Sequence, residues 1–171
     1  MTIIVLDTDK TSVVLAADQM WVEAELITKY SSKLVPIMRG TRVIGMIGTA
    51  GSARKGMQFE QLILSEFRKS TASANPLELL RTVIDTSWEA KKCPQAIVVL
   101  RGVGYVVDED GLVTQQDRFA IGTGAHIALG AMWGRKGTAA RLAKFGCEAA
   151  CALITNCGGK IDVFEMPRQS S

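Results

Sequence analysis

The second residue of the chain carries the clearest potential for chemistry. Met1 is followed by threonine, a residue small enough that the initiator methionine is commonly removed, which would leave Thr2 with a free α-amine. An α-amino group has a pKa of about 7.7 to 8.0, so near neutral pH it accepts a proton from the adjacent hydroxyl and acts as its general base. Thr2 then combines a nucleophile and a base, although a Met-Thr start by itself is common among proteins without this role.

Other residue types that commonly carry catalysis are sparse. His126 is the only histidine and follows a glycine-rich turn, a place where histidine is usually structural. A triad of nucleophile, histidine and acid is therefore not expected. The glycine-rich segments 48–56 and 122–130 precede expected helices, as anion-binding loops do, but neither ends in the lysine and hydroxyl pair of a P-loop.

The cysteines do not form a metal-binding pattern. Cys147 and Cys151 share a helical face by their spacing, and Cys93 and Cys157 lie elsewhere. With one histidine in the chain the ligands for zinc are too few. We expect buried free thiols, no metal and no cofactor.

The composition is that of an ordinary globular protein. Apolar residues make up 47% and charged residues 22% of the 171 residues, which suits one core in a single domain, residues 1–171. The net charge of +3 is spread along the chain among acids, so no nucleic-acid partner is predicted. No apolar stretch approaches the roughly 18 to 20 residues of a membrane span, and no secretory signal is recognised. We expect a cytoplasmic protein without a membrane partner.

The hydrophobic pattern alternates between strands and helices. Short apolar runs punctuated by polar turns predict strands, whereas apolar residues at spacings of three and four predict helices. The expected strands are residues 2–6, 12–17, 34–38, 42–47, 95–101, 104–107, 119–121 and 160–166. The expected helices are residues 52–69, 75–92, 126–133 and 138–151.

This order, with runs of strands followed by pairs of helices, favours an α+β fold over a doubly wound sheet. Residues 95–101 form an almost unbroken apolar run, typical of a strand covered on both faces. A layered sandwich with two sheets inside and helices outside accounts for this double-sided apolarity.

Three polar residues lie at the ends of expected strands. Thr2 opens the first strand, Asp18 ends the second after the small-residue run Leu15 to Ala17, and Lys33 precedes the apolar strand from Leu34. The chain thereby resembles the proteasome β subunits and the bacterial HslV peptidase, members of the N-terminal nucleophile hydrolases. The resemblance extends over nearly the whole chain, through the loop 48–52, the turn 120–125 and the glycines before the last strand.

The resemblance implies a four-layer αββα sandwich and a set of roles. Thr2 Oγ would attack a peptide carbonyl, Lys33 would place a positive charge beside it, and Asp18 would hold that lysine by a charge-assisted hydrogen bond. The amide of Gly48, or of its neighbours Thr49 and Ala50, would donate to the oxyanion.

Two further sets of residues follow from the resemblance. Thr123 takes the place of the serine that helps to orient the threonine amine in the family. Val35 and Met46 either line the pocket for the residue before the scissile bond or belong to the core.

The chain departs from the family pattern before its last strand. Proteasome subunits have an aspartate there, followed three residues later by a serine and two glycines. Here the glycines are Gly158 and Gly159, Cys157 holds the serine position, and Ile154 holds the aspartate position. One orienting carboxylate is thus replaced by an apolar side chain.

The resemblance implies a threonine-type endopeptidase that acts on protein or peptide substrates. Such subunits form homo-oligomeric rings that enclose their sites and receive unfolded chains from an ATPase unfoldase. Two alternatives stay open: a catalytically silent structural subunit of a ring, which Ile154 favours, and an amidase that uses the same Thr2 chemistry on a small substrate.

Overall fold

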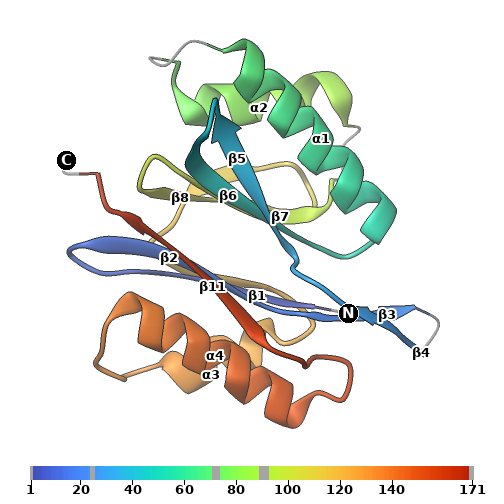
Figure 1. Ribbon diagram of the computed structural model, residues 1–171, viewed down its shortest axis with the longest axis vertical. Coiled ribbons are helices and arrows are strands. Elements are labelled where there is room, and N and C mark those ends of the chain that lie inside the picture. The colour runs from blue at the N-terminus through green and yellow to red at the C-terminus, as the bar shows by residue number, and fades with distance from the viewer. Residues whose placement is uncertain (1, 24–25, 71–73, 89–92, 170–171) are drawn as a thin grey trace.

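The protein is built from four stacked layers. The computed structural model describes residues 2–23, 26–70, 74–88 and 93–169. Helices α1 and α2 cover one side, two antiparallel sheets lie in the middle, and α3 and α4 cover the other side (Figure 1). This arrangement confirms the αββα sandwich expected from the sequence.

The first sheet has five strands in chain order. They are β5 (Leu34–Arg39), β6 (Arg42–Ala50), β7 (Gln95–Leu100), β8 (Val103–Val107) and β9 (Val113–Gln115). The helices on its outer face are α1 (Ala53–Lys69) and α2 (Pro76–Ser87). The side chain of Asn75 caps α2 by accepting a hydrogen bond from the Leu77 amide at 3.0 Å, and Pro76 occupies the first helical position, where its missing N–H is harmless.

The second sheet joins the two ends of the chain. Its order is β10 (Arg118–Gly122), β1 (Ile3–Thr8), β2 (Ser12–Asp18) and β11 (Ile161–Pro167). Its outer face is covered by α3 (Ala125–Met132) and α4 (Ala139–Leu153). Small residues of α4, among them Ala143, Gly146 and Ala150, are fully or almost fully buried, and they let this helix pack closely.

The double-sided burial of the central strands explains their sequences. Ile3 and Val5 of β1 pack toward α3 and α4, whereas Ile4 and Leu6 belong to the cluster between the sheets. All four are fully buried. Successive side chains of a strand point to opposite faces, so a strand with an apolar layer on each side reads as a continuous apolar run, as residues 3–6 and 95–100 do.

Two expectations from the sequence are corrected. No strand is expected from the sequence between residues 17 and 34, but a separate hairpin of β3 (Met20–Glu23) and β4 (Leu26–Tyr30) lies there. Helix α2 ends at Ser87 and not at residue 92; Trp88 is its C-cap with an extended backbone and its ring packs on Phe59, with ring centroids 6.5 Å apart. Residues 89–92 lie outside the described part of the chain.

The described helices are each too short or too polar to cross a membrane.

Candidate active site

Asp18 is the centre of a fully buried hydrogen-bond cluster. As the last residue of β2 it lies opposite Ile161 of β11 and has no exposed surface. Its Oδ1 accepts hydrogen bonds from the Ile3 amide at 2.9 Å and from Lys33 Nζ at 2.7 Å. Its Oδ2 accepts from the amides of Gly158 at 3.1 Å and Met20 at 3.3 Å. Four donors from four segments thus fix one carboxylate.

Lys33 is held beside this carboxylate by its position just before β5. The residue is 4% exposed, and a buried ammonium group requires a partner of opposite charge. Asp18 is that partner, and the ring of Trp21 lies 5.8 Å from Lys33 Nζ, within the range of a cation–π attraction. The ammonium is therefore fixed by both an ion pair and an aromatic face.

Thr2 lies next to this pair. The Ile3 amide and Lys33 Nζ bind the same oxygen of Asp18, so the residue that follows Thr2 is tied directly to the lysine's counter-ion. Thr2 itself is 7% exposed. Its carbonyl packs against Gly122, which faces Ile3 across the β1–β10 ladder and has a φ of +91°. A Cβ at Gly122 would lie 2.2 Å from the Thr2 oxygen, so only glycine permits this contact.

Gly48 allows close packing between the two sheets, a role that the sequence did not reveal. It lies within β6, opposite Leu34 of β5 and Ile97 of β7. A Cβ there would be 2.9 Å from Ile4 Cδ1, so the missing side chain lets the two sheets approach each other.

The register of β6 also fixes which way its amides point. The Arg101 amide donates to the Ile44 carbonyl at 3.1 Å, so the backbone N–H and C=O of Ile44 point toward β7. Because these groups alternate in direction along a strand, the amide of Gly48 also points toward β7. The amide of Thr49 points to the opposite side, beyond the start of β5 and toward Lys33. Of the amides considered from the sequence, that of Thr49 has the better direction for a site at Thr2 and Lys33.

The remaining residues named from the sequence lie in different environments. Val35 is opposite Ile47 and Pro36 is opposite Met46, and cross-strand partners share a face. Val35 therefore lies on the face toward α1, while Met46 packs into the cluster between the sheets, so these two side chains do not form one wall. Thr123 directly follows Gly122, and its side chain is exposed.

The segment before β11 is apolar. Ile154 is the C-cap of α4 and packs against the cluster that contains Cys157 and Cys147. Burial and, to a smaller extent, the nearby Asp18 carboxylate raise the pKa of Cys157 to about 11, with Lys33 acting in the opposite direction. Cys157 is therefore a neutral thiol near neutral pH, and no carboxylate comes from position 154.

Some parts of the cluster were not foreseen from the sequence. Trp21, the Met20 amide and the Gly158 amide all contribute to it, and Gly122 packs on Thr2. Every residue type except proline supplies a backbone donor, so such donors cannot be recognised from the sequence. The pair Gly158 and Gly159 did indicate a turn before β11. Across the described residues no cluster of histidine, cysteine or acid side chains suits a metal ion.

Comparison with known structures shows what this architecture is. HslV from Trypanosoma brucei matches with a TM-score of 0.79 at 18% identity, covering 97% of this chain and 99% of that chain. BPH from Thiobacillus denitrificans matches with a TM-score of 0.75 at 18% identity, covering all of both chains. The chain has the fold of HslV. A second structure of that BPH, in complex with epoxomicin, matches with a TM-score of 0.74 at 18% identity and covers 98% of this chain and 100% of that chain.

This is the fold that the sequence resemblance implied. No protein-family model matches the sequence, and no curated protein matches it either. The likeness is therefore one of fold, and the site must be argued from its own residues.

Proposed function

We propose that the chain is a threonine-type endopeptidase in which Thr2, after loss of Met1, is both nucleophile and base. The observation that carries this proposal is the shared oxygen of Asp18, which binds Lys33 Nζ and the amide next to Thr2. The carboxylate of this ion pair has no exposed surface, so the pair costs solvation energy, and a role beside the nucleophile gives that cost a purpose.

The first step follows from the groups around Thr2. The free α-amine takes the hydroxyl proton while Oγ attacks the carbonyl carbon of the substrate peptide. The Lys33 ammonium favours the developing negative charge, and Asp18 keeps that ammonium in place. The Thr49 amide donates to the tetrahedral oxyanion, because the Gly48 amide faces β7, and one such donor contributes about 2.7 to 4 kcal/mol to transition-state stabilisation.

The second step returns the site to its starting state. The protonated amine gives its proton to the leaving amine, which departs with the C-terminal part of the substrate. Water then attacks the ester on Thr2 Oγ, with the amine again acting as base. Thr123 orients the amine in this proposal, and Val35 of β5 and Met46 of β6 shape the approach of substrate from opposite faces of the five-stranded sheet.

The fold similarity supports an assembly as well. HslV-type chains that act on proteins are expected to enclose their sites in a homo-oligomeric ring and to accept unfolded substrates from an ATPase unfoldase. A small-molecule amidase is the less economical alternative, because the chain covers its structural neighbours end to end without a large insertion that would form a pocket.

Ile154 favours a second candidate, a structural ring subunit without activity. It replaces an orienting acid by an apolar side chain within the cluster around Cys157. A Thr2→Ser variant, which retains the hydroxyl, and a Thr2→Ala variant, which lacks it, separate the two functions when each is assayed with a fluorogenic peptide and an unfolded protein.

For a peptidase we expect hydrolysis by the unaltered chain and by Thr2→Ser, and a loss of more than about a thousandfold for Thr2→Ala. An unaltered chain that assembles into a ring but hydrolyses neither substrate supports the structural subunit. Hydrolysis by Thr2→Ala at the unaltered rate contradicts the proposal.

A further inference from the structure

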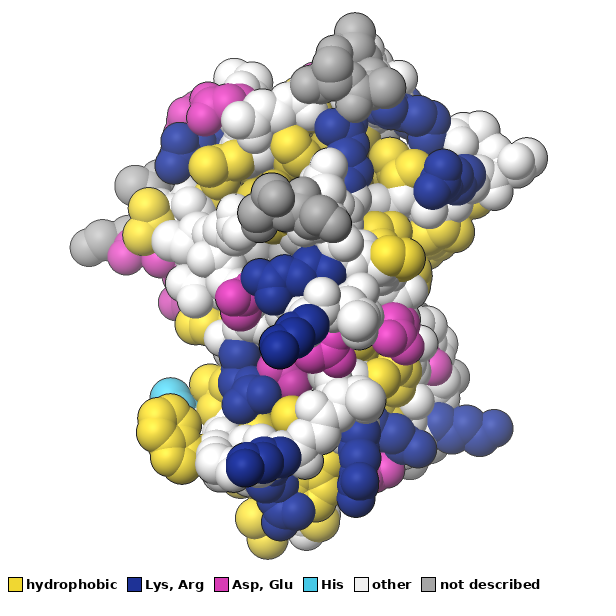
Figure 2. Space-filling view, turned by 90° about the vertical axis from the view of Figure 1, so that its left-hand side faces the viewer, with side chains coloured by type: hydrophobic (Ala, Val, Ile, Leu, Met, Phe, Trp, Pro, Cys, Tyr) yellow, Lys and Arg dark blue, Asp and Glu magenta, His cyan; other side chains and the backbone are white. Residues whose placement is uncertain are grey.

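A hollow lies at the end of the sandwich away from Thr2. The registers define the two ends: Asp18 pairs with Ile161, whereas Ser12 at the other end of β2 pairs with Pro167. A cleft of about 740 Å³ opens at this far end, between the five-stranded sheet and β11. Figure 2 faces this end of the molecule and shows Lys and Arg side chains, with a few acids among them, gathered over its middle.

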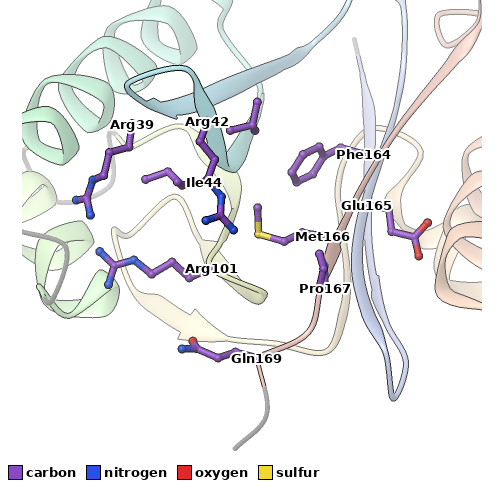
Figure 3. Close-up of a pocket in the computed structure, with 10 residues that line it drawn as sticks. Arg39, Arg42, Ile44, Arg101, Phe164, Glu165, Met166, Pro167 and Gln169 are labelled. Carbon is purple, nitrogen blue, oxygen red and sulfur yellow. The ribbon is translucent and has the colours of Figure 1, made fainter.

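Three arginines line one wall of the cleft. Arg39 and Arg42 flank the β5–β6 turn, and Arg101 lies in the turn between β7 and β8. Arg39 Nη2 donates to the Ser70 carbonyl at 3.3 Å and Arg101 Nη1 to the Ala74 carbonyl at 3.0 Å. The only acid of the described lining is Glu165, whose carboxylate points away from the cleft (Figure 3). The cleft therefore concentrates positive charge without a facing carboxylate.

Arg101 has two unfavourable features at this position, its backbone conformation and an unpartnered buried donor. Its φ of +51° is the only positive value at a described non-glycine residue. Together with Gly102 at +75° it forms the kind of two-residue hairpin turn in which Asn-Gly is preferred. Its Nη2 is buried and has no hydrogen-bond partner among the described residues. A buried donor of a charged group without an acceptor is rare in native proteins and calls for an explanation.

The facing wall is apolar. Phe164, Met166 and Pro167 of β11 lie across the cleft from Arg42 and Ile44 (Figure 3). The β11 end is fixed in place, because the Gly102 amide contacts Met166 Sδ at 3.1 Å and the Gln169 amide donates to the Gly102 carbonyl at 3.4 Å. A mostly apolar hollow with a few charged groups has the character of a small-ligand site.

We propose that this cleft binds an organic anion with an apolar body, whose carboxylate or phosphate group is held by Arg101 and Arg42 and whose apolar part packs on Phe164 and Met166. The planar guanidinium group offers paired N–H donors that match both anionic groups. The apolar wall distinguishes this ligand from an inorganic anion.

Four probes separate the two parts of this ligand. N-acetylphenylalanine carries a carboxylate and phenyl phosphate a phosphate, each with an apolar ring. N-acetylphenylalaninamide keeps the ring without the charge, and inorganic phosphate has the charge without the ring. In a titration of the full chain followed by NMR we expect saturable binding of at least one of the first two. Whichever of these binds more tightly identifies the anionic group.

The two control probes should bind at least about tenfold more weakly, as loss of a charge-assisted hydrogen bond or of the buried ring implies. Equal binding of the amide, or equal binding of inorganic phosphate, overturns the proposal.

Variants of the chain test the assigned residues. Arg101→Asn removes the guanidinium and introduces a residue that suits the turn, so it should weaken binding about tenfold or more while its Tm does not fall. Arg42→Gln is a second variant, because Arg42 is exposed and has no hydrogen-bond partner in the described part of the chain. Arg141→Gln on α4 makes the same charge change elsewhere and should leave binding unchanged. Unchanged binding in Arg101→Asn and Arg42→Gln, or equal loss in Arg141→Gln, overturns the assignment.

Discussion

Replacement of Asp18 by asparagine should be among the most damaging single changes in the chain. The carboxylate has no exposed surface and accepts hydrogen bonds from three backbone amides and from Lys33 Nζ. Asparagine has nearly the same shape, so the substitution leaves packing intact. It removes the negative charge and turns one acceptor oxygen into a donor that faces other donors.

The magnitude follows from the burial of the partner. The Lys33 side chain is 3% exposed, so in Asp18→Asn an ammonium group is left without its counter-ion and away from water. Removal of one partner of a buried ion pair costs about 3 to 5 kcal/mol. Lys33→Met should cost less, because the carboxylate then retains its three backbone donors, each worth about 1.5 to 3 kcal/mol as a hydrogen bond to a charged group.

Urea unfolding at one fixed protomer concentration measures these costs. We expect Asp18→Asn to lower the free energy of unfolding by more than Lys33→Met does, and the double variant to be more stable than the sum of the single losses predicts. If Asp18→Asn loses less than about 1 kcal/mol, or if the two losses are simply additive, the ion pair is not the buried, coupled unit described above.

Three further predictions concern other parts of the fold. Hydrogen bonds from the amides of Ala139, Thr11 and Ser12 hold the pKa of Asp9 well below its usual range. The resulting stabilisation is present above the pKa of Asp9 in the unfolded chain, near pH 4, and is lost as the pH falls toward the lower pKa in the folded chain. Asp9→Asn should therefore flatten the acid side of a Tm-versus-pH curve. Gly122→Ala should destabilise the chain and displace Thr2, because its Cβ would meet the Thr2 carbonyl, whereas Gly130→Ala, with open space around it, should raise the unfolding free energy by about 0.5 to 1 kcal/mol. Burial raises the pKa of Cys151 to about 12 and of Cys157 to about 11, so both should react slowly with iodoacetamide at pH 8 and fast in denaturant, as mass spectrometry of the alkylated peptides reports.

The layered fold was predictable because its signals are local. Residues 3–6 and 95–100 are apolar at every position or nearly so, which marks strands buried on both faces. Asn75 and Pro76 mark the start of α2, where the Asn75 side chain accepts a hydrogen bond from the Leu77 amide. The hairpin β3–β4 was missed because its strands have only four and five residues and form a sheet of their own, so each gives only a short pattern in the sequence.

The candidate site was predictable in part. Asp18 and Lys33 were identified from their places at the end of one strand and the start of another, and the structure brings them to 2.7 Å. The site depends equally on backbone groups, such as the amides of Ile3 and Gly158, which any residue type supplies. The direction of the Thr49 amide depends on the register of β6. A shift of one residue reverses that direction, and a single sequence did not fix the register.

The most direct test of the account is the mass of the native protein before and after incubation with epoxomicin. We predict a chain that begins at Thr2, a gain of one inhibitor mass located at Thr2, and no gain for Thr2→Ala. Retention of Met1 on the native chain, or equal labelling of Thr2→Ala, would contradict a catalytic Thr2.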